Sequence, residues 1–249
     1  MQEILIYSTK IICLKCILNL RIKGFITKMT IKLSPSSLNL FLDCPRCFWL
    51  QIIKKIKRPS GAFPSLPSGM DKILKIHFDN FMKKGELPPE LKREYCVNGC
   101  SLFDDVNLLK IWRSNLKGIQ YLDKESGAIL HGAIDNLLVK GKKFIVLDYK
   151  TRGFPLKEDT HKSYQSQMNI YNFLLRENGY QTEDFTYLLF YYPNHVTENG
   201  EVIFDTKLIK ISTNPENGKE IFKKAIKLLQ EKEPPRTSES CEFCEWKKN

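Results

Sequence analysis

Two acidic residues and a lysine lie at the ends of two apolar runs that a tight turn joins. The first run, Gly132-Ala133-Ile134-Asp135, ends on a carboxylate, and the second, residues 145–151, carries Asp148 and Lys150. Side chains two positions apart on a strand point to the same face, so Asp148 and Lys150 are expected side by side. Burying acids together with a lysine is costly unless a cation compensates. The pattern predicts a metal-dependent phosphodiesterase, in which the acids hold the metal and the lysine faces the developing charge.

The elements that must position these residues follow from hydrophobic periodicity and from helix-capping signals. Ser34 suits a helix N-cap with Pro35 at the first helical position, and Pro193 and Pro234-Pro235 suit element ends. Helices are expected at residues 35–55, 69–84, 106–122, 162–177 and 216–232, and strands at 127–139, 143–150, 185–192 and 202–211. This order predicts an α/β fold in which a mixed sheet is flanked by helices.

The length and the N-terminal region predict one domain with an appendage. The 249 residues contain 42% hydrophobic residues, which suits one large domain or a domain with an extension. The apolar run at residues 11–18 is too short to span a membrane, Lys15 interrupts it, and no signal-peptide cleavage site follows. Residues 1–28 therefore read as an extension or a misassigned start before a domain at 29–249, with a short packed helix as the alternative.

The charge balance favours a polyanionic partner. The formal net charge is +11 at pH 7, and the pI is about 9.2. Nucleic acid and anionic membranes are partners of this kind, whereas the alternative is that lysine-rich helices are only solvated faces.

Eight cysteines without a secretory segment suggest a cytoplasmic, reducing setting, where cysteine pairs indicate metal binding more than disulfides. Cys44 with Cys47 and Cys241 with Cys244 form two CxxC pairs near opposite ends of the domain. Four thiolates suit either zinc or an iron–sulfur cluster, and free buried thiols are the less favoured alternative. A second site is not favoured for the remaining cysteines, which are Cys13, Cys16, Cys96 and Cys100.

Five short motifs occur in a specific order. They are Ser34-Pro35-Ser36-Ser37-Leu38 with Cys44-Pro45, Gly69 with His77, Gly132-Ala133-Ile134-Asp135, Asp148-Tyr149-Lys150-Thr151, and Gln167-Met168-Asn169-Ile170-Tyr171. Their order and spacing over residues 34–244 resemble the PD-(D/E)XK nuclease superfamily. Within it they resemble the RecB-like branch, which includes CRISPR-associated exonucleases and the AddAB and RecBCD nuclease domains. The resemblance implies a restriction-endonuclease-like core with helical additions.

The resemblance also implies a metal site. Asp135 and Asp148, the backbone carbonyl of Tyr149 and His77 would hold Mg²⁺ or Mn²⁺, which would activate water for attack on phosphorus. Lys150 would orient that water or stabilise the transition-state charge. The alternatives are an ordinary Asp148–Lys150 ion pair on an edge strand and a core histidine at position 77.

Further residues are implied to contact the substrate. Gln167 and Tyr171 would share a helix face that lines the site and helps to place Lys150 or the nucleic-acid strand. By their residue types rather than by the resemblance, Arg152 and the nearby Lys157 and Lys162 would contact phosphates beside the site, and Tyr164 would stack on a base. The alternatives are helix packing for Tyr171 and surface charge without a role for Arg152, as for its neighbours Lys157 and Lys162.

The branch often holds a [4Fe–4S] cluster with one cysteine before the core and three after it. Cys44, Cys241 and Cys244 match this pattern, the last expected cysteine is missing, and Cys47 is the obvious replacement. On resemblance the cluster is favoured over Zn²⁺, although the thiolate count alone does not decide. Either would tie the terminal segment to the first helix.

Together these features predict a cytoplasmic, metal-dependent DNA nuclease, by resemblance an exonuclease on single-stranded ends in DNA repair, recombination or CRISPR adaptation. No helicase motif is present, so a partner would supply any unwinding. The alternatives are a nucleic-acid-binding module with a degenerate site and a nuclease active only within a partner complex.

Overall fold

The computed structural model describes residues 30–61 and 63–245. The chain divides into two units at residues 30 and 31, and the second unit contains everything that follows. The expectations for residues 1–28, including Cys13 and Cys16, lie outside the described residues.

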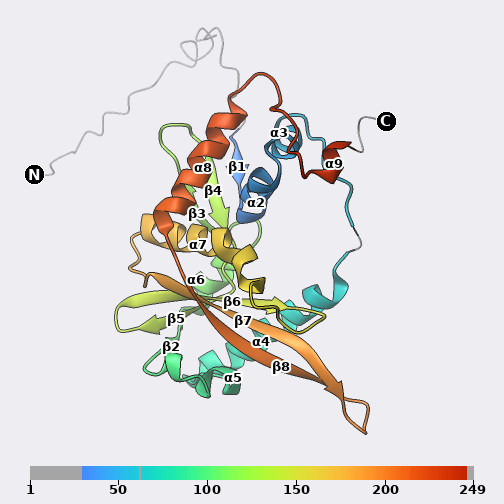
Figure 1. Ribbon diagram of the computed structural model, residues 1–249. Coiled ribbons are helices and arrows are strands. Elements are labelled where there is room, and N and C mark those ends of the chain that lie inside the picture. The colour runs from blue at the N-terminus through green and yellow to red at the C-terminus, as the bar shows by residue number, and fades with distance from the viewer. Residues whose placement is uncertain (1–29, 62, 246–249) are drawn as a thin grey trace, which may run out of the picture. The chain divides into compact units, whose positions relative to one another are not determined.

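A five-stranded mixed sheet forms the centre of the domain (Figure 1). Its strands, in spatial order, are β2 (Ser101–Leu102), β5 (Asn136–Lys140), β6 (Lys143–Thr151), β7 (Phe185–Val196) and β8 (Val202–Ser212). β6 pairs with β7 in parallel, and the other neighbours pair antiparallel. The mixed sheet flanked by helices confirms the predicted fold class.

The parallel β6–β7 pair requires a crossover, which runs through η2 (Thr160–Tyr164) and α7 (Gln165–Glu177). Residues 168–175 of α7 are all buried, so this helix belongs to the core rather than to the surface. α8 (Pro215–Leu229) packs against α7, and its N-cap Asn214 accepts a hydrogen bond from the Asn217 amide. Figure 1 shows both helices on the same side of the central sheet.

α4 (Ser65–Lys84) packs against the opposite face of β6. The ring of Phe78 lies on the ring of Tyr149, with 4.4 Å between centroids. Because strand side chains alternate, Tyr149 faces α4 while Asp148 and Lys150 face away from Phe78. The helix ends at Gly85, whose φ of +69° is the left-handed conformation that a glycine cap supplies.

A second, three-stranded sheet has the order β1 (Lys32–Leu33), β4 (Ile129–Gly132) and β3 (Ile119–Leu122). The strand expected at residues 127–139 is therefore two strands, β4 and β5, which belong to different sheets. Ala133-Ile134-Asp135 crosses between them. This break places Asp135 outside regular pairing, where its side chain can turn toward β6.

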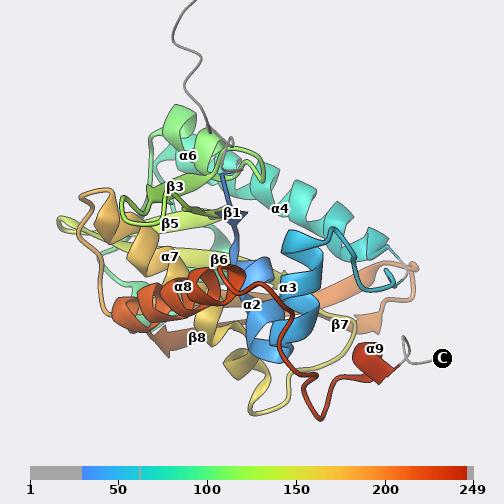
Figure 2. The ribbon, with the colours of Figure 1, turned by 90° about the horizontal axis from the view of Figure 1, so that it is seen from above.

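The helix expected at residues 35–55 is also two helices, α2 (Pro35–Asp43) and α3 (Pro45–Ile53). The break falls at Cys44, whose extended backbone, with φ −151°, is what a residue before proline prefers. Cys44 and Cys47 are therefore held where α2 meets α3, two helices that Figure 2 shows from above.

Other boundaries also differ from expectation. The helix expected at 106–122 is α6 (Val106–Trp112), because Gly118, with φ +61°, makes a turn into β3. β7 continues through Pro193 with a register shift between Pro193 and His195. The remaining short elements are α5 (Pro89–Lys92), η1 (Tyr95–Val97) and α9 (Glu242–Glu245). Among the described residues, every helix is too short or too polar to cross a membrane.

Candidate active site

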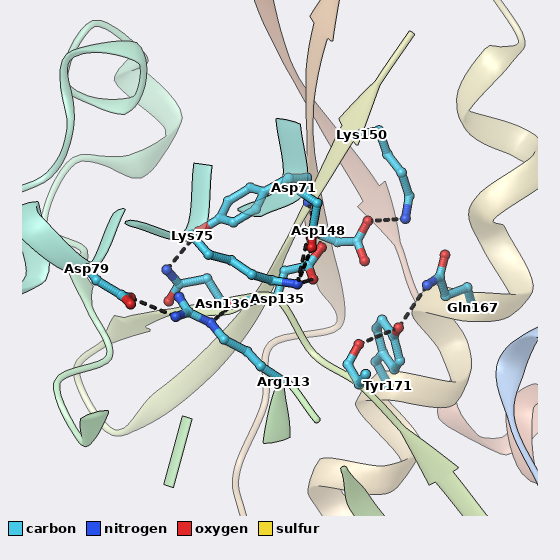
Figure 3. A network of polar contacts seen from close by, with 12 residues as sticks. Asp71, Lys75, Asp79, Arg113, Asp135, Asn136, Asp148, Lys150, Gln167 and Tyr171 are labelled. Atoms are coloured by element: carbon cyan, nitrogen blue, oxygen red, sulfur yellow. Dashed lines mark hydrogen bonds and ion pairs between the residues drawn. The ribbon is translucent and has the colours of Figure 1, made fainter. Parts of the chain in front are cut away.

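A cavity of about 550 Å³ opens where β6, α4, α7 and the start of α2 converge. Its lining includes the two acidic residues and the lysine that the sequence singled out, which are Asp135, Asp148 and Lys150. Figure 3 shows these side chains turned toward one another, Asp148 and Lys150 from β6 and Asp135 from the segment between β4 and β5.

Asp148 and Lys150 lie side by side on β6, as the spacing predicts. The Asp148 side chain is 2% exposed, and its Oδ2 contacts the Lys150 ammonium. Burial raises the pKa of Asp148 to about 6, with Asp135 adding to this rise and Lys150 opposing it. Burial acts to lower the pKa of Lys150, but the carboxylates of Asp148 and Asp135 outweigh burial and raise it.

Asp135 is held from both its side chain and its backbone. Its Oδ2 accepts a hydrogen bond from the Tyr149 amide at 3.2 Å, which ties it to β6. Its carbonyl accepts a hydrogen bond from Arg113 Nε at 2.6 Å, and Arg113 Nη1 pairs with Asp79 of α4 at 2.7 Å. The carboxylate is thus fixed between β6 and α4.

α4 contributes two residues that the sequence analysis missed. Lys75 Nζ lies 3.1 Å from Asp135 Oδ1 and 2.8 Å from the Asp71 carboxylate (Figure 3). Asp71 and Lys75 are four residues apart, so they share one helix face, and both line the cavity. The signal available in the sequence was this acid–lysine pair on one face of the helix that contains Gly69.

The structure does not bring His77 to the carboxylates, which corrects the expectation that His77 completes the metal site. Its Nε2 lies 2.9 Å from Glu90 Oε1, and it lines a separate cavity with Tyr191. The physical reason is helical phase: two residues beyond Lys75 the side chain points about 200° around the helix.

Gln167 and Tyr171 share a face of α7, and their side chains are hydrogen-bonded to each other. Gln167 Nε2 donates to the Tyr171 hydroxyl at 2.8 Å, and that hydroxyl donates to the Ala133 carbonyl at 2.7 Å. Gly132 allows this contact, because a Cβ there would lie 2.8 Å from Tyr171 Cε1. The pair thus anchors the segment that leads to Asp135 and also lines the cavity.

Tyr164 and Arg152 lie outside the residues that line the cavity. The Lys150 ammonium lies 4.9 Å from the centre of the Tyr164 ring, and this ring also packs edge-on against Phe190. Arg152 is half-buried just after β6, and its amide donates to the Tyr191 carbonyl at 2.9 Å. Tyr164 therefore contacts the lysine rather than standing free on the surface.

His131 is a further lining residue that the sequence analysis did not identify. It is half-buried on β4, and its Nδ1 has no hydrogen-bond partner among the described residues. Burial lowers the pKa of His131, and the nearby charge of Lys32 lowers it further. The other lining residues that were missed are Ser34, Pro35, Ser36 and Asn115.

The donors in this cavity fit a divalent cation of the magnesium type. They are carboxylate oxygens, which hard cations prefer. Asp148 Oδ2 is buried and receives no hydrogen bond of good geometry, although it contacts the Lys150 ammonium. The three carboxylates of Asp71, Asp135 and Asp148 face two ammonium groups, so the cluster retains one net negative charge for a cation to compensate.

A second constellation lies at the α2–α3 junction. The sulfurs of Cys44, Cys47, Cys241 and Cys244 are buried and all lie within 4.8 Å of one another. The two CxxC pairs therefore meet as predicted, and a group of four thiols can bind zinc or an iron–sulfur cluster.

Comparison with known proteins agrees with this fold. No curated protein matches the chain. The family model of the PD-(D/E)XK nuclease superfamily matches residues 32–248, a range that includes the whole cavity and all four clustered cysteines. This superfamily consists of nucleases that use divalent metals. The chain belongs to the PD-(D/E)XK nuclease superfamily.

Proposed function

We propose that this protein is a Mg²⁺- or Mn²⁺-dependent DNA nuclease that hydrolyses phosphodiester bonds at the cavity of Asp135, Asp148 and Lys150. The observation that carries the proposal is the convergence of the buried Asp148, the half-buried Asp135 and a lysine in one cavity. Such a set is costly to bury without a cation, as the raised pKa of Asp148 shows.

The ligands in this proposal are Asp135, Asp148 and the backbone carbonyl of Tyr149. Asp71 is the carboxylate that α4 offers where the resemblance had suggested His77. A bound divalent ion supplies a nucleophilic water at neutral pH and neutralises charge on the phosphate.

Lys150 supplies the positive charge that faces the phosphate. Its side chain is 17% exposed, and Asp148 and the face of the Tyr164 ring hold its ammonium group, so this group is positioned before substrate arrives. Gln167 and Tyr171 act through the Ala133 carbonyl and so fix the approach to Asp135. Lys75 holds Asp71 and Asp135 together in the protein without metal.

The substrate and pathway belong to the same proposal. A net charge of +11 supports a nucleic-acid partner, with Arg152 beside the site as one phosphate contact. The order of the motifs from Ser34 to Tyr171 supports a RecB-like exonuclease on single-stranded ends. Such an enzyme would act in DNA repair, recombination or CRISPR adaptation, with a partner protein supplying any unwinding. Two CxxC pairs that meet as one possible metal-binding group, rather than as disulfides, support a place in the cytoplasm.

Cleavage of end-labelled single- and double-stranded DNA with Mg²⁺ or Mn²⁺ tests this function. Asp148→Asn should abolish cleavage, whereas the matched variant Asp104→Asn, at an exposed acid outside the cavity, should cleave at the native rate. A ladder that grows from one end indicates an exonuclease. Equal cleavage by Asp148→Asn and the native protein would overturn the assignment. Binding without cleavage by folded native protein would instead favour an enzyme that needs a partner complex.

A further inference from the structure

The four-cysteine site has sulfur spacings that discriminate between its two candidate occupants. Cys44 Sγ lies 3.6 Å from Cys244 Sγ, and Cys47 Sγ lies 3.6 Å from Cys241 Sγ and 3.5 Å from Cys244 Sγ. All four sulfurs lie within 4.8 Å of one another, and none is in a disulfide. The thiols thus form one compact group rather than two separated pairs.

A single tetrahedral ion requires this spacing. A zinc–thiolate bond is about 2.3 Å, and a tetrahedron's edge is about 1.6 times its centre-to-corner distance, so adjacent sulfurs lie about 3.8 Å apart. The observed distances of 3.5 and 3.6 Å are within a few tenths of an ångström of that value.

A cubane cluster requires a larger tetrahedron. Each thiolate binds its own iron, so the four sulfurs form a larger tetrahedron than they do around a single ion. Each edge of this tetrahedron is longer by the iron–iron separation, so neighbouring sulfurs lie roughly 6 Å apart. A two-iron cluster likewise separates the thiolates of one iron from those of the other. A set of four sulfurs within 4.8 Å fits neither arrangement without moving the backbone at the α2–α3 junction or before α9.

We infer that the four cysteines bind one zinc ion in a closed, structural site, in place of the iron–sulfur cluster that the resemblance favoured. Zinc is also bound more tightly than Fe²⁺ by a given set of ligands, which favours it among ions that accept four thiolates. The two-plus-two CxxC arrangement is the pattern of such sites.

The surroundings compensate the negative charge that remains when one Zn²⁺ binds four thiolates. Four thiolates around Zn²⁺ carry two net negative charges, and Arg58 Nη2 donates to Cys241 Sγ at 3.2 Å. Arg58 is oriented by Asp43 at 2.5 Å and lies over the Phe243 ring at 4.5 Å. The guanidinium is therefore fixed beside the sulfurs by one acid and one aromatic ring, and it acts as a positioning residue for the thiolate site.

Metal analysis tests this inference without using nuclease activity, so its failure is distinct from failure of the proposed function. The full chain is expressed with iron, a sulfide source and zinc all supplied, purified without oxygen, and measured for zinc, iron and acid-labile sulfide. About one zinc per chain, with iron and sulfide absent, is the expected result. Stoichiometric iron, with or without sulfide, or the absence of both metals, would overturn it.

Single substitutions locate the ion. Cys241→Ser should reduce bound zinc several-fold or more, whereas Cys100→Ser, at a half-buried cysteine outside the cluster, should leave zinc unchanged. Replacement of zinc by Co²⁺ should give the visible absorption of a tetrahedral thiolate complex in the native and Cys100→Ser proteins. This spectrum should be lost in Cys241→Ser, and its persistence there would place the ion elsewhere.

Arg58→Leu separates charge compensation from simple packing. This variant should retain zinc when isolated but lose it to a chelator faster than the native protein, because the thiolate that Arg58 stabilises is more easily protonated. The rate of zinc loss from Arg58→Lys should lie between those of the native protein and Arg58→Leu, since lysine keeps the charge but not the planar contact with Phe243. Identical release rates in all three proteins would remove Arg58 from the site.

Discussion

At the scale of single residues, Asp148 sets the charge balance of the candidate active site. Its pKa is about 6, above the ordinary value of 3.8, because burial disfavours the charged form. Between these two values the folded protein holds a proton that the unfolded chain releases. The contribution of Asp148 to stability is therefore greatest below pH 4 and falls as the pH rises toward 6. Metal binding needs the charged form and competes with this proton.

The first prediction is that stabilisation by Mn²⁺ grows as the pH rises through about 6. The increase in melting temperature caused by saturating Mn²⁺ should be several degrees larger near pH 7.5 than near pH 5, as thermal unfolding will measure. Asp148→Asn should flatten this dependence, since the amide does not titrate. A Mn²⁺ effect that is independent of pH in the native protein would show that Asp148 does not bind the ion.

Tyr164 illustrates how a residue's neighbours change its expected role. From sequence it was a candidate for stacking on a base, but its ring lies against the Lys150 ammonium. A cation over an aromatic face is stabilised by about 0.5 to 2 kcal/mol. If this stabilisation acts only in the transition state, it changes the rate by a factor of about 2 to 30. Tyr164 is then a positioning residue for Lys150.

The second prediction separates these roles by steady-state kinetics on a short DNA substrate. Tyr164→Leu should lower kcat by about 2- to 30-fold with little change in KM, and Tyr164→Phe should behave like the native enzyme. A rise in KM with unchanged kcat would instead support contact between the ring and a base.

The residues of the candidate site were predictable from sequence to the extent that they depend on local pattern. Asp148 and Lys150 share a face because strands alternate, and that rule needs no tertiary information. Asp71 and Lys75 were missed because the face that α4 turns to the sheet is set by packing, here by Phe78 on Tyr149. That packing was not visible in the apolar pattern of residues 69–84.

At the scale of elements, the approach of α7 to β4 determines where Asp135 lies. The Tyr171 hydroxyl reaches the Ala133 carbonyl only because Gly132 has no side chain. A Cβ at position 132 would lie 2.8 Å from Tyr171 Cε1 and 2.9 Å from Leu174 Cδ1, and both of these side chains are buried. α7 would therefore have to shift, and the segment before Asp135 would shift with it.

The third prediction is that Gly132→Ala destabilises the fold by about 1 to 3 kcal/mol, the usual cost of overpacking a well-packed core. Urea unfolding will measure the change, and cleavage should fall beyond any loss of folded protein. Gly153→Ala is the matched control, because open space surrounds Gly153 and its backbone is unstrained. Equal stability of the two variants would mean that α7 adjusts without cost.

The helices and strands also show which features of the fold can be predicted from sequence and which cannot. The β5–β6 hairpin was predictable because Gly141 and alternating residues mark it locally. The division of residues 127–139 between two sheets was not, because β4 and β5 differ only in their partners. β4 pairs with β3, the strand just before it, and with β1, which is distant in sequence and carries no local signal of that pairing.

At the scale of the whole molecule, the four-cysteine site joins the two ends of the nuclease domain. Cys47 and Cys241 are 194 positions apart, and the segment between α8 and α9 has little regular structure. Two hydrogen bonds between side chains and backbone also hold this segment, from Trp49 to the Glu231 carbonyl and from Arg46 to the Pro235 carbonyl. The bound ion is therefore the main restraint that we expect on residues 230–241.

The fourth prediction follows from this restraint. Removing the ion with a strong chelator, or substituting Cys241→Ser and Cys244→Ser together, should speed tryptic cleavage at the exposed Lys232 and Arg236 several-fold. Residues 31–229 should stay resistant, because their core is continuous without the cysteines. Mass spectrometry of the fragments will locate the cuts, and Cys96→Ser, at an exposed thiol outside the cluster, is the control. Unchanged cleavage rates after complete removal of the ion would show that packing of α9 on α3, not the thiolate site, holds the end of the domain.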